Sequence, residues 1–152
     1  MKIVVGDKRI ENAQAVADTM NRAGFDVLPV EMDLSSRTSI LKLIDTAQQY
    51  GEIAMLVNAA GVSPSQASVE TILKVDLYGT AVLLEEVGKV IRQGGTGVTV
   101  SSQSGHRLPA LGAETDELLA CTRQKDYWSL MSCSHNRSAI HSMPTSWLNA
   151  AM

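Results

Sequence analysis

The chain has 152 residues, of which 45% are hydrophobic and 19% are charged, and its formal net charge is −3 at pH 7. This length predicts one domain that needs no disulfide or metal ion to stabilise its core, and the composition excludes a disordered chain. The negative charge offers no basis for binding nucleic acid, and no apolar run approaches the roughly 20 residues of a membrane helix. Because two cysteines are typical of a reducing compartment, we expect a cytoplasmic protein.

The first part of the chain predicts an alternation of strands and helices. The expected order is a strand at 3–5, a helix at 11–23, a strand at 25–30, a helix from Ser35 or Ser36 to Gly51, and a strand at 54–57. The strands are short apolar runs, which are typical of buried parallel strands, and the helices carry apolar residues at helical spacing. Gly24 is suited to end the first helix, and Pro29 indicates that the second strand lies at a sheet edge.

The next segment predicts one long helix and a further strand. Helical spacing of apolar residues extends from about Val69 to Arg92, the glycine-rich stretch 94–97 breaks it, and Val98–Val100 forms a strand. An alternation of this kind predicts a parallel sheet with right-handed crossovers. The expected fold class is therefore α/β, with a doubly wound parallel sheet in three α/β/α layers.

Polar or small residues follow the predicted strands. They are Asp7, Asp33, residues 58–61 and residues 101–105. In doubly wound sheets, ligands bind outside the carboxyl ends of the strands. These positions therefore predict a site for a ligand of nucleotide size.

Three segments carry a more specific resemblance. Leu56–Gly61 resembles the Asn-Asn-Ala-Gly element of the short-chain dehydrogenase/reductase family, Val75–Thr80 resembles its helix segment that begins with Val-Asn, and Val98–Gly105 resembles its strand that ends in a catalytic serine. The segments occur in the family's order, and the similarity covers roughly residues 2–112. The resemblance implies a Rossmann-like fold, partial in this chain, and an oxidoreductase that transfers hydride between NAD and a small alcohol or carbonyl substrate.

The resemblance also implies residues at the adenosine end of the cofactor. Asp7 corresponds to the acid that binds the ribose hydroxyls, and a carboxylate there repels a 2′-phosphate, so NAD is expected rather than NADP. Lys8 and Arg9 follow directly and weaken this preference. Asp33 corresponds to the acid near the adenine amino group. From the residues alone, the alternatives are a solvated turn acid at Asp7 and a helix N-terminal acid at Asp33.

At the reacting end, four consecutive residues correspond to the segment that passes beside the cofactor: Asn58, Ala59, Ala60 and Gly61. Ser102 corresponds to the serine that hydrogen-bonds the substrate oxygen, and Asp76 stands where the family has a catalytic Asn. That Asn holds a water through its backbone carbonyl, so an Asp can serve the same purpose. Without the resemblance, residues 58–61 are a plain strand-to-helix turn and Ser102 belongs to an ordinary polar loop.

Two elements of the family are missing from the sequence. No glycine-rich turn for the cofactor pyrophosphate precedes Asp7, so Met1 falls at the start of the family's second strand. A competing alignment makes Ile3–Val5 the first strand, with a degenerate turn. The catalytic Tyr-x-x-x-Lys is missing as well, because the residue four positions after Tyr127 is Met131.

The family's first strand is central in its sheet, between the second and fourth strands. Its loss removes about five buried side chains, on the order of 10 kcal/mol, which is comparable with the stability of a typical domain. Two arrangements are open. The strand near residues 2–6 moves into the central position, or another chain or the carboxyl-terminal tail covers the exposed edge.

The end of the chain differs in character, because its apolar periodicity stops near Cys121 and both tryptophans lie beyond this point. We expect a core at 1–112 and a divergent tail at 113–152. One set of residues has the chemistry but not the spacing of a common zinc site, so no metal is expected: Cys121, Cys133, His135 and His141. His106 is expected at the mouth of the substrate site.

Two functions remain open. The first is NAD-dependent hydride transfer, impaired in this chain by the missing motifs. The second is a non-catalytic remnant that binds nucleotide weakly or pairs with another subunit. We expect a homo-oligomer formed through the helix at 69–92.

Overall fold

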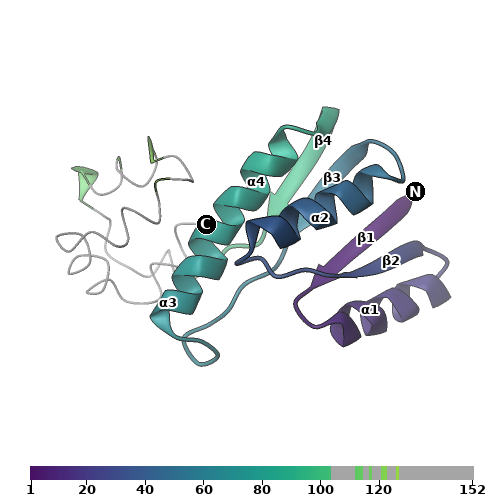
Figure 1. The fold of residues 1–152 in the computed structure, drawn as a ribbon, viewed down its shortest axis with the longest axis horizontal. Coiled ribbons are helices and arrows are strands. Elements are labelled where there is room, and N and C mark those ends of the chain that lie inside the picture. Colours follow the sequence, from purple (N-terminus) through teal and green to yellow (C-terminus); the bar gives the residue numbers. More distant parts are fainter. Residues whose placement is uncertain (104–111, 115–116, 118–120, 123–125, 127–152) are drawn as a thin grey trace.

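A computed structural model describes residues 1–103, 112–114, 117, 121–122 and 126. The elements in chain order are β1 (Lys2–Asp7), α1 (Ile10–Arg22), β2 (Asp26–Glu31), α2 (Arg37–Gln48), β3 (Ile53–Asn58), α3 (Val69–Ile72), the π-helical segment η1 (Leu73–Gly79), α4 (Thr80–Gly88) and β4 (Ile91–Thr99). This order confirms the predicted alternation of strands and helices (Figure 1). None of the described helices has the length and apolar character of a membrane-spanning segment.

Both strand pairs are parallel, as the alternation predicted. β1 pairs with β2 along its whole length, beginning with Lys2 beside Asp26, and β3 pairs with β4, ending with Asn58 beside Thr99. β2 hydrogen-bonds to β1, and because each of the four described strands has one strand partner, the edge position predicted from Pro29 stays a prediction. Helix α1 packs against β1 and β2, whereas α2 packs against β1 and α4.

The four strands form two separate sheets within the described residues, β1–β2 and β3–β4. β1 therefore stays beside β2 and does not hydrogen-bond to β3. The expectation that residues 2–6 move into the central position is wrong for this part of the chain. The competing alignment of Ile3–Val5 with the central first strand loses support for the same reason.

Local hydrogen bonds fix where the first two helices begin and end. The Asp7 carboxylate accepts a hydrogen bond of 2.8 Å from the Arg9 amide just before α1. Ser36 is the cap of α2, since its hydroxyl accepts a hydrogen bond from the Ser39 amide. Gly24 after α1 has φ +92°, a backbone conformation that favours glycine. The predicted cap residue Ser36 and stop residue Gly24 thus fix the bounds of the helices that flank the first two strands.

The end of the long helix is a correction to the sequence prediction. The helical segment that begins at Val69 ends at Gly88 and not at Arg92, and β4 already starts at Ile91. Ile91 pairs with Ile53 of β3, and a register shift follows before the regular pairing resumes. Because Ile91 also packs against the main core, strand pairing and burial outweigh the helical spacing of residues 89–92.

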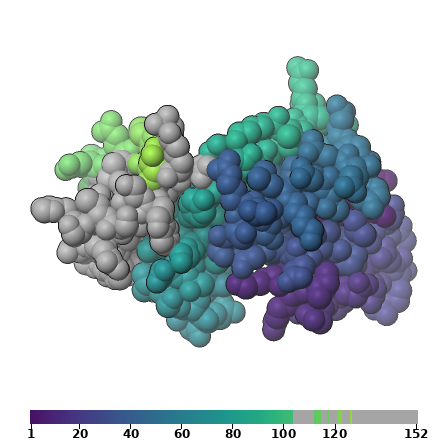
Figure 2. Space-filling model, viewed as in Figure 1, coloured from purple at the N-terminus to yellow at the C-terminus, as the bar shows by residue number. Residues whose placement is uncertain are grey.

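The main hydrophobic core lies between α2, α4 and the β3–β4 pair. Its buried members are Met32, Leu34, Ile40, Ile44, Val75, Val82, Leu83 and Val87. The side chains of α2 (blue) and α4 (teal) lie beside one another on the face shown in Figure 2. Arg37 at the start of α2 also forms an ion pair with Glu86 of α4. This packing places the carboxyl ends of β3 and β4 next to η1, where the candidate site lies.

Candidate functional site

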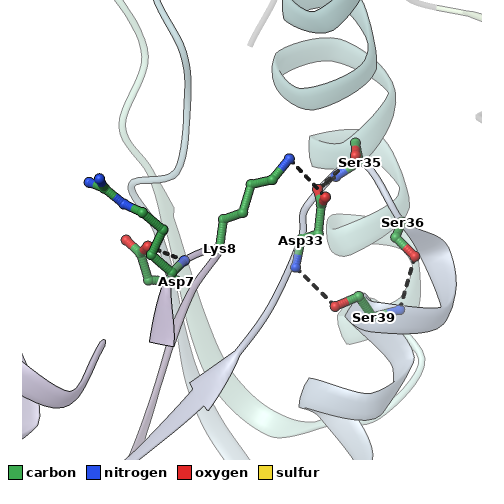
Figure 3. A network of polar contacts seen from close by, with 7 residues as sticks. Asp7, Lys8, Asp33, Ser35, Ser36 and Ser39 are labelled. Atoms are coloured by element: carbon green, nitrogen blue, oxygen red, sulfur yellow. Dashed lines mark hydrogen bonds and ion pairs between the residues drawn. The ribbon is translucent and has the colours of Figure 1, made fainter. Parts of the chain in front are cut away.

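The carboxyl ends of β1 and β2 carry the two acids predicted for the adenosine end (Figure 3). Asp7 ends β1, and its Oδ1 accepts hydrogen bonds from the Arg9 amide at 2.8 Å and from Asn12 Nδ2 at 3.2 Å. The carboxylate therefore holds the turn into α1. A carboxylate has about four lone-pair sites, so these two bonds leave acceptor capacity for ribose hydroxyls.

Asp33 follows β2 and is the centre of a polar network (Figure 3). Its Oδ1 accepts hydrogen bonds from the Ser35 amide at 2.9 Å and the Ser35 hydroxyl at 2.6 Å. Its Oδ2 forms an ion pair with Lys8 Nζ at 3.0 Å. Burial acts to raise the pKa of Asp33, but these contacts outweigh burial and lower it below its usual value. Asp33 organises the loop into α2, and contact with an adenine amino group stays a prediction.

Lys8 links the two turns at this edge. It belongs to the turn after β1, and its ion pair reaches the Asp33 carboxylate in the loop after β2. Lys8 is therefore directed toward Asp33 and does not form an ion pair with the Asp7 carboxylate in the described structure. The pair is largely exposed, so its contribution to stability is expected to be about 1 kcal/mol or less. The pair matters because it directs the positive charge of Lys8 to Asp33 and not to the Asp7 carboxylate.

A cavity of about 250 Å³ lies at the carboxyl ends of β3 and β4. Its lining residues come from three segments far apart in the sequence: Ala59, Ala60, Gly61, Val62, Ser63, Gln66, Asp76, Val100, Ser101 and Ser102. The structure thus brings together Ala59–Gly61, Asp76 and Ser102, which the sequence analysis predicted for the reacting end. Ser102 is half-buried in this lining.

Asn58 lies just behind the cavity and is buried, with 3% of its surface exposed. Its Oδ1 accepts a hydrogen bond of 3.3 Å from the Ala60 amide, and its Nδ2 donates one of 3.4 Å to Thr80 Oγ1 at the start of α4. Its backbone carbonyl accepts a hydrogen bond from the Val100 amide at 2.8 Å. Asn58 therefore joins β3, the cavity loop, α4 and the end of β4. This is a positioning role beside the predicted cofactor segment.

Asp76 is the buried acid of the cavity, with 1% of its surface exposed. It lies in η1, and single π-helical turns inside α-helices are frequent at functional sites. Asp76 Oδ1 accepts a hydrogen bond of 2.9 Å from the Val62 amide. Burial raises the pKa of Asp76 above its usual value, although the hydrogen bond from Val62 acts in the opposite direction. The Asp76 side chain thus fixes the loop after β3. When this buried carboxylate is ionised, it lowers the stability of the folded state.

Replacing Asp76 by Asn tests this cost. Because the pKa of Asp76 is raised in the folded state, the folded state favours the protonated carboxyl group. Its contribution to stability is therefore fully present below about pH 4 and is lost as the pH rises through the folded pKa. Asp76→Asn keeps an oxygen for the Val62 amide and removes the buried charge. We expect the variant to be more stable than the parent at pH 7, with the difference shrinking toward pH 4.

Thermal unfolding between pH 4 and 8 measures the effect. Asp45→Asn, at an exposed position on α2, is the matched control and should leave the pH profile unchanged. A difference between Asp76→Asn and the parent that does not change with pH would contradict the expected ionisation.

Several lining residues were missed by the sequence analysis. Val62, Ser63 and Gln66 belong to the loop between β3 and α3, where Ser63 donates hydrogen bonds to Gln66 Oε1 at 2.9 Å from both its amide and its hydroxyl. The signal available was Ser-Pro-Ser at 63–65, which is typical of a turn. That signal places a loop but gives no indication that the loop closes a cavity.

Other candidate residues lie outside the described structure. These are Tyr127, His106 and three of the four residues considered for zinc, Cys133, His135 and His141. Cys121 is described and has an exposed free thiol. Within the described residues, no group of three or more His, Cys, Asp or Glu side chains has the arrangement of a metal site.

Comparison with known proteins gives a family match over most of the chain. The profile of the family described as short chain dehydrogenase matches residues 1–113. "Short-chain dehydrogenase/reductase bsc3" of Alternaria brassicicola is 36% identical over 107 residues, which cover 70% of this chain and 39% of that protein. "Tropinone reductase-like 3" of Erythroxylum coca is 25% identical over 117 residues, covering 71% of this chain and 45% of that protein. The chain thus spans less than half the length of both relatives.

Solved structures give the same fold. A short-chain dehydrogenase/reductase of Serratia marcescens superposes with a TM-score of 0.61 at 22% identity, covering 82% of this chain and 56% of that one. The glucose/ribitol dehydrogenase-type protein of Brucella melitensis gives a TM-score of 0.64 at 20% identity, and the match covers 84% of this chain and 59% of that one. These matches confirm the predicted α/β class and its Rossmann-like architecture.

Proposed function

Because this chain belongs to the short-chain dehydrogenase/reductase family, we propose that it carries part of a site for hydride transfer between NAD(H) and a small alcohol or carbonyl compound. One observation carries the proposal. The cavity at the ends of β3 and β4 is lined together by Ala59–Gly61, Asp76 and Ser102. We propose further that turnover by this chain is impaired, and that it acts in the cytoplasm.

The described residues fit the two ends of a dinucleotide differently. At the adenosine end, Asp7 offers a carboxylate at the end of β1, which suits the ribose hydroxyls. At the reacting end, the hydroxyl of Ser102 lines the cavity and would hydrogen-bond the substrate oxygen. The bound cofactor would supply or accept the hydride. No glycine-rich turn for the pyrophosphate precedes α1 in this sequence.

Asp7 is expected to favour NADH over NADPH by about tenfold or more, which corresponds to about 1.4 kcal/mol. Its carboxylate is held at the strand end by the Arg9 amide and by Asn12. Lys8 is paired with Asp33, so of the two basic residues that follow Asp7 only Arg9 opposes the negative charge that would face a 2′-phosphate. Fluorescence titration with NADH and NADPH measures the preference. Asp7→Asn should reduce it, and Glu11→Gln, an exposed acid in the first turn of α1, should not. Tighter binding of NADPH by the parent chain would contradict the proposal.

A second candidate function, a non-catalytic nucleotide-binding remnant, rests on a different observation. The family pairs its serine with a Tyr-x-x-x-Lys, in which the tyrosine transfers the proton and the lysine lowers its pKa. After Ser102 this sequence contains one tyrosine, Tyr127, and Met131 stands where the lysine is required. A turnover assay on a panel of secondary alcohols and ketones separates the two functions, because turnover at any substrate excludes the remnant.

Replacing Ser102 by alanine tests the role of the serine hydroxyl in this chain. In a competent site, removing this donor to the developing oxyanion should lower turnover by about 10²-fold or more. Because no tyrosine–lysine pair follows it, we expect no dehydrogenase activity to lose, with stability and nucleotide binding within about 0.5 kcal/mol of the parent. A dehydrogenase rate in the parent that collapses in Ser102→Ala would contradict this expectation.

We also propose a homo-oligomer formed through the helical segment that starts at Val69. Most of α4 faces the core, including Val82, Leu83 and Val87, but Leu84 is 44% exposed. An outward leucine on an amphipathic helix suits contact with a second copy. Sedimentation of the parent chain and of Leu84→Glu tests this, and an unchanged oligomer in the variant would place the interface elsewhere.

A further inference from the structure

The buried carboxyl group of Asp76 uses only one of its two oxygens within the described structure. Oδ1 accepts the hydrogen bond of 2.9 Å from the Val62 amide, and no described residue donates to Oδ2. A Cβ atom at Gly61 would also approach the carboxyl at Oδ1, at 3.4 Å. Asp76 is 1% exposed and yet lines the cavity. Because a buried polar atom without a partner costs free energy, Oδ2 indicates a ligand that completes its bonding.

The cavity lining contains no charge to compensate an ionised Asp76. Its other members come from residues 59–66 and 100–102, which carry no titratable side chain. The pKa of Asp76 is changed by burial and by the hydrogen bond from Val62, and not by a neighbouring charge. Since charges buried in proteins are normally paired, an ionised carboxylate at this position favours a cation in the cavity.

The charged groups of the adjoining helical segments are paired with one another. Lys74 of η1 forms an ion pair with Glu70 of α3 at 2.9 Å. On α4, Glu85 and Glu86 form ion pairs with Lys89 at 3.0 Å and 2.9 Å. The remaining titratable group of η1, the Tyr78 side chain, packs against the hydrophobic core. Within the described part of the chain, the positive charge for the buried carboxylate therefore has to come from a ligand.

The walls of the cavity favour an organic cation over a metal ion. Magnesium and calcium require about six or more oxygen ligands, and no group of three or more His, Cys, Asp or Glu side chains is arranged for a metal among the described residues. The walls are partly apolar, with Ala59, Ala60, Val62 and Val100. An ammonium group offers several N–H donors, and an attached hydrocarbon body suits these walls. The volume of about 250 Å³ limits that body to a compact one.

We propose that this cavity binds a small organic ammonium compound, whose N–H groups donate to Asp76 Oδ2 and whose apolar body packs against the alanine and valine side chains. The inference deepens the proposed function and rests on it in one respect, because it implies that the alcohol or carbonyl substrate also carries an amino group. Binding of the ammonium group itself requires neither cofactor nor turnover. Absence of turnover would therefore bear on the hydride transfer alone, whereas the titrations below bear on the cation site alone.

Two probes of similar shape and different charge test the site. Cyclohexylamine is protonated at pH 7, as a lysine side chain is, whereas cyclohexanol is neutral. Each is titrated into the full 152-residue chain in a calorimeter without cofactor, in about 0.15 M sodium chloride to screen exposed charges. We expect the ammonium probe to bind about tenfold or more tightly than the alcohol, or about 1.4 kcal/mol. Equal affinity of the two probes, tighter binding of the alcohol, or no binding of either would overturn the proposal.

A pair of chain variants assigns the effect to Asp76. Asp76→Asn keeps an oxygen for the Val62 amide and removes the charge, so the affinity for cyclohexylammonium should fall to that for cyclohexanol. Glu70→Gln removes the same charge from an exposed acid on α3, directly before η1, and should leave both affinities unchanged. Unchanged binding in Asp76→Asn, or an equal loss in the two variants, would overturn the proposed contact.

The pH dependence of binding gives a second readout. As the pH falls, Asp76 takes up a proton, and a protonated carboxyl group no longer attracts an ammonium group. Because burial raises the pKa of Asp76, the affinity of the parent for cyclohexylammonium should decrease from about pH 8 to about pH 4. In Asp76→Asn it should stay constant over this range. A constant affinity in the parent, or the same decrease in both proteins, would overturn the proposal.

Discussion

Replacing Ile40 by alanine is expected to lower the free energy of unfolding by about 2–5 kcal/mol. Ile40 is 0% exposed and lies in the main core cluster. It belongs to α2, the helix that packs against β1 and against α4. Because no strand of one sheet pairs with a strand of the other within the described residues, side-chain packing such as that of α2 has to hold them in one structure.

The control for Ile40→Ala is the neighbouring Leu41→Ala. Leu41 is 36% exposed on the same helix, so its truncation should cost about 0.5 kcal/mol or less. Urea unfolding followed by circular dichroism measures both variants. Equal losses would show that α2 contributes through its helical stability and not through the core cluster.

Replacing Gly79 by alanine is expected to destabilise the fold by about 1–3 kcal/mol. A Cβ atom at Gly79 would meet the carbonyl oxygen of Leu34, so the helical segment approaches the loop after β2 too closely for a side chain. Leu34 is itself a core residue, and its backbone cannot move away without disturbing the packing between α2 and α4. The same movement would displace Asp76, three residues earlier in η1, and with it the cavity loop.

Gly88 supplies the matched control for Gly79. It is the last residue of α4, and a Cβ atom there would meet no atom within 4 Å. Gly88→Ala should therefore raise stability by about 0.4–1 kcal/mol, since alanine restricts the unfolded chain and suits a helix. Melting temperatures of both variants test the contrast, and a stabilising Gly79→Ala would contradict the close approach.

The sequence alone determined the order and direction of the elements. Apolar spacing, the stop at Gly24, the cap at Ser36 and the edge proline Pro29 are local features, and the structure has the corresponding elements close to the predicted bounds. The motifs at Ala59–Gly61, Asp76 and Ser102 were also found from the sequence, because each occupies its own element in a fixed order. Their roles toward cofactor and substrate stay predictions.

Only the tertiary structure decided features that depend on partners distant in the sequence. The helix from Val69 ends at Gly88 because Ile91 pairs with Ile53 of β3. The local spacing of apolar residues does not show whether residues 89–92 continue the helix or join a strand. The raised pKa of Asp76 comes from its burial, and the lowered pKa of Asp33 comes from groups on two turns. The separation of β1 from β3 likewise follows from long-range pairing, which a one-dimensional apolar pattern does not encode.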